Sequence, residues 1–82
     1  MKITLDVYLP ASGCCYEVEM DSEVPLSRLT GLIAQALERL TGGLYHAGEA
    51  AVLCDRRTGA IFNINMTPGG LGLKNGSAVM LI

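Results

Sequence analysis

The chain has 82 residues, a formal net charge of -2 at pH 7, 50% hydrophobic residues and 17% charged residues. This balance excludes a disordered chain, and the mild acidity argues against a nucleic-acid-binding surface. Because there is no Trp and only one Phe, the core must be aliphatic. The size fits one small domain that spans residues 1–82.

The opening residues predict a cytoplasmic protein without direct membrane insertion. Lys2 is followed by a short apolar stretch that Asp6 interrupts at once, so no signal peptide is formed. No apolar run reaches the ~18 residues that a membrane span requires. Three cysteines, an odd number with two of them adjacent, do not make a disulfide framework, and this fits a reducing compartment.

The first two segments predict a β-hairpin. In residues 2–9, alternate residues are apolar, and residues 14–20 repeat this period of two. Between them, residues 10–13 contain Pro10 and Gly13, which favour a turn. The two strands should therefore be antiparallel neighbours.

The next segment predicts one amphipathic helix. Residues 21–25 combine potential capping side chains with Pro25, which is tolerated in a first helical turn. The apolar positions then recur at spacings of three and four; they are Leu26, Leu29, Ile33, Leu37 and Leu40. The Gly42-Gly43 pair should end the helix, with Leu44 making the apolar contact that often accompanies a glycine cap. Gly31 inside the helix is either a tolerated weak point, which we favour, or a site of close backbone approach.

The remaining chain predicts three more strands. They occupy residues 51–54, 60–64 and 78–82, after a loop over 44–49 and with turns at 55–59 and 74–76. The predicted order is β-β-α-β-β-β, in which one helix covers one face of one sheet. We therefore expect an α+β, ubiquitin-like β-grasp fold, whose mixed five-stranded sheet has the order 2-1-5-3-4.

Three segments resemble the YukD/EsaB family, which are ubiquitin-like accessory proteins of type VII (ESX-like) secretion systems in bacteria. They are the opening strand 2–7, the helix 25–36 that begins at Pro25, and the closing segment 71–82 with its Asn75-Gly76 turn. The loop after the helix, the Arg56-Arg57 hairpin and Cys14-Cys15 depart from that family's pattern. The resemblance implies a cytoplasmic protein whose partner is a protein component of the secretion apparatus.

Ubiquitin-like modifiers and sulfur carriers react through a terminal Gly-Gly. Here the sequence stops at Ile82, and the pairs Gly42-Gly43 and Gly69-Gly70 are internal, where glycine serves turns and caps. We therefore expect neither conjugation nor sulfur transfer.

The cysteines and the one histidine do not predict a metal site or a catalytic site. Cys14, Cys15, Cys54 and His46 have the right number for a Cys3His zinc site, but neighbouring Cys14 and Cys15 point to opposite faces of a strand. Their default role is that of small apolar residues, although an exposed Cys15 leaves oxidation open. His46 has no relay partner nearby in the sequence. We expect a non-enzymatic protein without cofactor or metal.

Two charged groups have competing interpretations. Glu17, Glu19, Asp21 and Glu23 recur at every second position, either as a docking surface for a basic partner or, as we favour, as charges that protect an open sheet edge. Arg56-Arg57 form a solvated turn or engage an acidic partner.

The face of the sheet that points away from the helix is the most informative surface. If Val79 faces the helix, then Ala78, Met80 and Ile82 face outward together with Tyr8. Apolar residues in mid-sheet on an otherwise polar face are a partner site or ordinary background. The candidate partner-binding residues are Tyr8, Met80, Ile82, Arg56 and Arg57.

Three functions compete. The chain is a non-catalytic interaction module of a secretion apparatus, a relative of ubiquitin-like modifiers and sulfur carriers, or a β-grasp protein that self-associates, for example as a homodimer. The resemblance favours the first.

Overall fold

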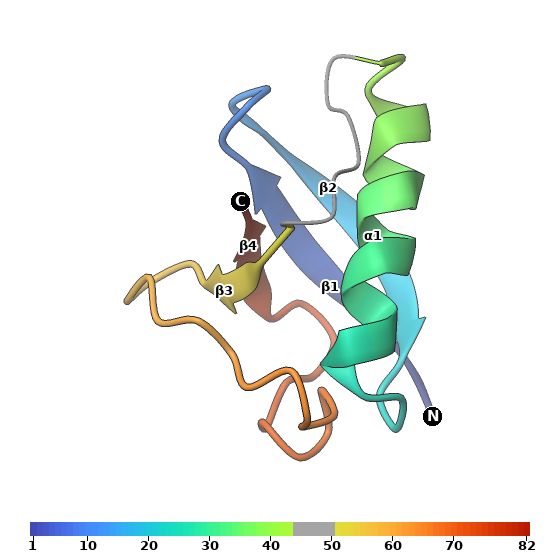
Figure 1. The fold of residues 1–82 in the computed structure, drawn as a ribbon, viewed down its shortest axis with the longest axis vertical. Coiled ribbons are helices and arrows are strands. Elements are labelled where there is room, and N and C mark those ends of the chain that lie inside the picture. The colour runs from blue at the N-terminus through green and yellow to red at the C-terminus, as the bar shows by residue number, and fades with distance from the viewer. Residues whose placement is uncertain (44–50) are drawn as a thin grey trace.

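The computed structural model describes residues 1–43 and 51–82, which fold as one helix packed on one four-stranded sheet (Figure 1). The elements are β1 (Lys2–Leu9), β2 (Cys14–Asp21), α1 (Leu26–Leu40), β3 (Leu53–Asp55) and β4 (Ala78–Leu81). The strands lie in the order β2-β1-β4-β3. β1 is antiparallel to β2 and parallel to β4, so the sheet is mixed.

The predicted hairpin is confirmed. β1 and β2 pair over their whole lengths, from Lys2 opposite Asp21 to Leu9 opposite Cys14. The alternation in β1 places every second side chain in the core against α1; these are Ile3, Leu5, Val7 and Leu9. Val18 and Met20 of β2 join them, so the hairpin supplies the larger part of the sheet's inner face.

The directions of the backbone groups follow from a few hydrogen bonds. The N–H of Ser22 donates to the carbonyl of Met1 (2.7 Å), which makes that antiparallel pair a hydrogen-bonded one. Hydrogen-bonded and non-hydrogen-bonded pairs then alternate along the hairpin. The backbone N–H and C=O groups of even-numbered residues of β2 therefore bond to β1, and those of odd-numbered residues point away from it. The N–H of Asp6 donates to Ser77 on the opposite side of β1 (2.9 Å), as this parity requires.

The predicted helix is also confirmed. Leu26–Leu40 is helical, and the buried face consists of Leu26, Leu29, Ile33, Ala34 and Leu37, whereas Leu40 of the predicted apolar stripe is exposed. The chain leaves the helix through Gly42 and Gly43, both at positive φ, and the N–H of Gly43 donates to the carbonyl of Glu38 (3.1 Å). The expected contact of Leu44 and the expected loop over 44–49 lie outside the described residues.

The start of the helix differs from the prediction. Pro25 is the N-cap, and no side chain caps the first turn. Instead, the N–H groups of Leu26 and Ser27 donate to the backbone carbonyls of Met66 (2.9 Å) and Ile64 (2.8 Å). The expected capping carboxylate of Asp21 accepts the N–H of Glu23 (2.9 Å) and is therefore engaged elsewhere. A distant loop thus satisfies the donors that a helix start leaves unpaired.

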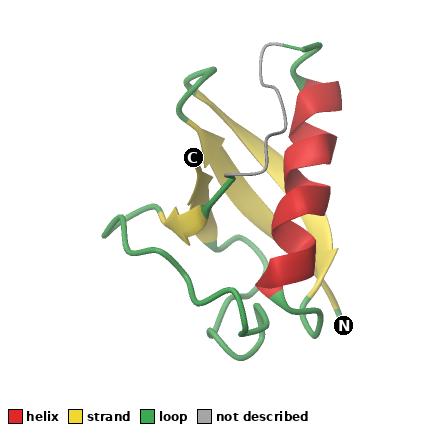
Figure 2. Ribbon diagram, viewed as in Figure 1, coloured by secondary structure: helices red, strands yellow, loops and turns green. Residues whose placement is uncertain are grey.

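The predicted strand 60–64 is wrong. Only an isolated bridge joins Ile61 to Cys54, and Figure 2 draws the whole connection from β3 to β4 as loop. Asn63 turns the chain off the sheet, because its side-chain oxygen accepts the N–H of Asn65 (2.9 Å) and its carbonyl accepts that of Met66 (3.1 Å). The carbonyls of Ile64 and Met66 are then directed at α1. The expected five-stranded order 2-1-5-3-4 is therefore replaced by the four-stranded order β2-β1-β4-β3.

The last strand is central, as predicted. Val79 and Leu81 of β4 are fully buried beneath the helix. The turn before β4 extends its pairing with β1: the side-chain oxygen of Asn75 accepts the N–H of Thr4 (2.7 Å), and the N–H of Gly76 donates to the carbonyl of Thr4 (2.9 Å). Asn75 and Gly76 therefore align β4 against β1.

The same substitution at two glycines should have opposite effects on stability. Gly31 lies inside α1 with open space where a Cβ would stand, which confirms the tolerated weak point, so Gly31→Ala should stabilise the domain by about 0.5–1 kcal/mol. Gly76 has a φ of +85°, so Gly76→Ala should destabilise it by about 1–2 kcal/mol despite equally open space. Urea unfolding of both variants measures this, and shifts of the same sign would contradict it.

Candidate interaction surface on the outer face of the sheet

The outer face, meaning the face of the sheet opposite α1, carries a row of four side chains across all the strands. Tyr8 of β1 lies between Cys15 of β2 and Met80 of β4, and Cys54 of β3 lies opposite Met80. The row results from registers in which paired residues share a face. The turn after β3 leads into Arg56, whose side chain returns over this row.

Arg56 is held on the outer face by three contacts. Its guanidinium lies over the ring of Tyr8, with 4.6 Å between the guanidinium carbon and the ring centroid. Nη1 donates to the sulfur of Cys15 (3.1 Å) and lies 3.9 Å from a carboxylate oxygen of Asp6. A stacked cation of this kind contributes about 0.5–1 kcal/mol at an exposed site. Arg56 thus connects the end of β3 with β1 and β2.

Like charges face each other beside this cluster. Asp6 and Glu17 are directly opposite on β1 and β2, an arrangement that is unfavourable for two carboxylates. Arg56 offsets the charge of Asp6. Within residues 1–43 and 51–82, Glu17 has no ion-pair partner, so its carboxylate remains available to a ligand.

The structure brings some of the predicted site residues together. Tyr8, Met80 and Arg56 form one cluster, and the side chain of Ile82, 55% exposed, extends the same face beyond β4. Arg57 does not join the cluster, because it is exposed in the turn, where its backbone N–H donates to the carboxylate of Asp55 (2.8 Å). The two neighbouring arginines therefore have different environments.

Sequence reasoning missed Asp6 as a partner of Arg56 and the position of Cys15 beneath it. The signal was present in the hairpin: a four-residue turn that joins Leu9 to Cys14 places Tyr8 opposite Cys15, and Asp6 follows two positions away on the same face. The contact made by Arg56 could not be found in this way, because it depends on where a distant turn lies.

The three cysteines lie in two environments. Cys14 and Cys15 are exposed, whereas Cys54 is buried and its thiol donates to the carbonyl of Met80 (3.4 Å). Burial, and secondarily the charge of Asp55, raises the pKa of the Cys54 thiol, so it stays protonated near neutral pH. In the described ranges, no three His, Cys, Asp or Glu side chains converge on a point that could hold a metal ion. His46 lies outside those ranges.

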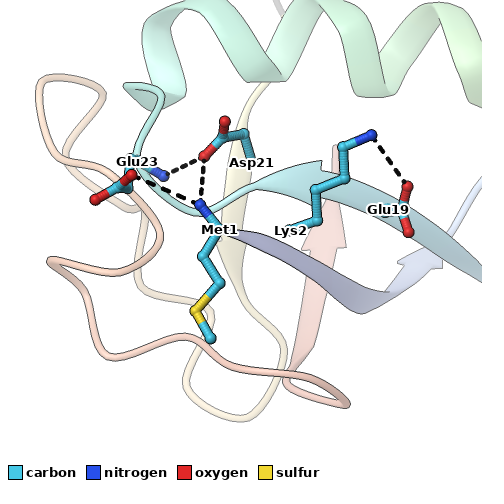
Figure 3. Close-up of polar contacts among 5 residues, drawn as sticks. All are labelled: Met1, Lys2, Glu19, Asp21 and Glu23. Atoms are coloured by element: carbon cyan, nitrogen blue, oxygen red, sulfur yellow. Dashed lines mark hydrogen bonds and ion pairs between the residues drawn. The ribbon is translucent and has the colours of Figure 1, made fainter.

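The edge strand β2 carries three of the four predicted acidic residues, Glu23 follows it, and part of their charge is neutralised. The N-terminal amine lies 3.3 Å from a carboxylate oxygen of Asp21 and 3.6 Å from one of Glu23, and the amine of Lys2 lies 3.6 Å from Glu19 (Figure 3). The Glu23 N–H, together with the N-terminal amine, lowers the pKa of Asp21. Among the described residues, Glu17 is the one of these four carboxylates that lies beside neither the N-terminal amine nor the amine of Lys2.

Comparison with solved structures shows a ubiquitin-like fold. The ubiquitin-like domain of EccD5 from Mycobacterium xenopi superposes with a TM-score of 0.83 at 16% identity, over 100% of this chain and 93% of that one. The ubiquitin-like domain of the Mycobacterium tuberculosis type VII secretion system protein EccD1 gives 0.73 at 10% identity, over 96% and 97%. A chain of the MycP5-free ESX-5 inner membrane complex gives 0.80 at 18% identity, over 99% of this chain and 20% of its own.

Ubiquitin-like proteins from other settings superpose with TM-scores of 0.68 to 0.74, so the likeness concerns the fold. No protein-family model matches the sequence, and no curated protein matches it either. Among the residues that the structure describes, no helix is both long and apolar enough to cross a bilayer.

Proposed function

We propose that this chain is a non-catalytic protein-interaction module, a YukD/EsaB-like cytoplasmic accessory component of a type VII secretion system, that acts without being conjugated to its targets. The sequence resemblance of the strand 2–7, the helix 25–36 and the closing segment 71–82 supports it. The likeness of the fold to ubiquitin-like domains of EccD proteins supports the same setting.

One observation carries the interaction role: Arg56 is stacked on Tyr8 beside Met80, on a face that the helix leaves uncovered. The side chain of Arg56 is 40% exposed while its guanidinium is already held in place. A partner that binds it does not have to restrict a freely rotating arginine, and such fixed side chains make efficient contacts. The surface fits a protein that presents an acidic group next to an apolar one.

Neighbouring arginines provide a matched test. In pull-downs and titrations with the proteins encoded by the neighbouring genes, Arg56→Ala should weaken binding about tenfold or more, as for a central interface residue. Arg57→Ala, which removes the same charge from the same turn, should change it by less than about twofold. Met80→Asp should weaken binding as Arg56→Ala does. Equal effects of the two arginine variants would contradict a binding site on the outer face.

The competing functions give different results in the same preparation. Incubation with ATP and an activating enzyme followed by mass spectrometry should show the unmodified mass, whereas a stable adenylate or thioester would indicate a modifier. Light scattering should show a monomer at high concentration, whereas a dimer would indicate self-association through this surface.

A further inference from the structure

The exposed edge of β2 offers backbone groups for pairing. β2 is an outermost strand, and among the described residues it pairs with β1 alone. By the alternation established above, the N–H and C=O groups of Cys15, Glu17, Glu19 and Asp21 point away from β1. An edge of this kind can accept another strand.

On the inner side of this edge lies an apolar groove between β2 and α1, with a volume of about 300 Å³. Its lining is mostly apolar and comprises Val18, Met20, Val24, Leu29, Leu32, Ile33 and Ala36, with Lys2, Glu19 and Asp21 at the rim. Leu32 is 59% exposed although it is a large apolar side chain. Aliphatic side chains inserted here would cover Leu32.

On the outer side of the same edge the side chains are acidic. Glu17 and Glu19 are both exposed and lie on the outer face, two positions apart. Only Glu19 has a cation beside it, the amine of Lys2 in Figure 3, while Glu17 lies opposite the like charge of Asp6. A positive charge placed next to Glu17 would relieve that repulsion.

We propose that the β2 edge binds an extended segment of a partner protein in which basic and aliphatic residues alternate, added to the sheet as a further strand. In a strand, successive side chains point to opposite faces. Alternation therefore sends every second side chain into the groove beside Leu32 and the others toward Glu17 and Glu19. A second copy of this chain does not fit, because pairing two β2 edges would bring their carboxylates together. This edge adjoins the Arg56 cluster at Cys15, but the proposal does not depend on the function of that cluster.

The direct test is an NMR titration of the full chain with a capped seven-residue peptide of alternating lysine and valine. Binding should slow amide hydrogen exchange at Cys15, Glu17 and Glu19, because these N–H groups become hydrogen-bonded. A peptide of the same composition with its lysines and valines in two separate blocks should bind several-fold more weakly. Equal binding of the two peptides, or binding without protection of these amides, would overturn the proposal.

Matched variants separate the charge from the groove. Glu17→Gln should weaken binding of the alternating peptide about threefold, whereas Gln35→Lys, which changes the net charge equally on an exposed part of α1, should have little effect. Leu32→Ser should weaken it about fivefold, and Leu40→Ser, which alters an equally exposed leucine, should not.

Two further outcomes distinguish this proposal from the proposed function. Met80→Asp, which disrupts the outer-face site at β4 away from the β2 edge, should change peptide binding by less than about twofold, so a failure of the outer-face site does not affect the result. A dimer that protects the same β2 amides without any peptide would overturn the proposal, because it would assign the edge to a second copy.

Discussion

Replacement of Leu37 by alanine should remove much of the stability of this domain. Leu37 is fully buried on the face of α1 that packs on the sheet. Deleting a buried leucine side chain in this way costs about 2–5 kcal/mol, against a total of roughly 5–15 kcal/mol for a small domain. Urea unfolding followed by circular dichroism should show a much lower midpoint.

The control lies three residues further along the same helix. Leu40 is 59% exposed, so Leu40→Ala removes the same atoms from a position that faces solvent. Its free energy of unfolding should change by no more than about 0.5 kcal/mol. If both variants lose equal stability, α1 does not pack on the sheet through the face described above.

Replacement of Val18 by proline should prevent the hairpin from forming. Val18 lies opposite Leu5 in a hydrogen-bonded pair, so its N–H is directed at β1. Proline removes this donor and cannot continue the ladder, which should cost about 3 kcal/mol or more. The loss of folded protein is measured by circular dichroism and by the disappearance of dispersed amide signals in the NMR spectrum.

Glu17→Pro is the matched control, one residue away in the same strand. The N–H of Glu17 points away from β1, and proline is tolerated on edge strands where the missing N–H faces solvent. This variant should stay folded, with a cost of about 1 kcal/mol from the lower strand propensity. Unfolding of Glu17→Pro while Val18→Pro stays folded would show that the N–H directions in β2 are the reverse of those described.

The sequence predicted those elements in which the spacing of the apolar residues matches the buried side. The alternation in residues 2–9 and the three-and-four spacing from Leu26 to Leu37 follow directly from which side of each element is buried. The apolar residues of 60–64 also predict a strand, but Ile61 and Ile64 are exposed, and the segment hydrogen-bonds to β3 only through Ala60 and Phe62 before it turns to α1. Local patterns could not show that the carbonyl of Ile64 would be needed by Ser27.

The candidate site was predictable to a similar degree. The outward position of Tyr8 and Met80 follows from strand alternation alone. The difference between Arg56 and Arg57 does not, because it arises from the position of a turn relative to strands about 40 residues away. Nothing in the sequence around Arg56 and Arg57 indicates that their environments differ.

The central place of β4 has a consequence for how the protein is made. β1 and β3 have no contact in the sheet except through β4, which comes from residues 78–81, and the loop that caps α1 also comes late, at residues 64–66. A ribosome that has made only the hairpin and the helix has therefore made a chain whose apolar side is still partly open to solvent. Folding of this domain therefore has to wait until residues 78–81 have been synthesised, and a nascent chain that lacks them exposes apolar surface that favours aggregation.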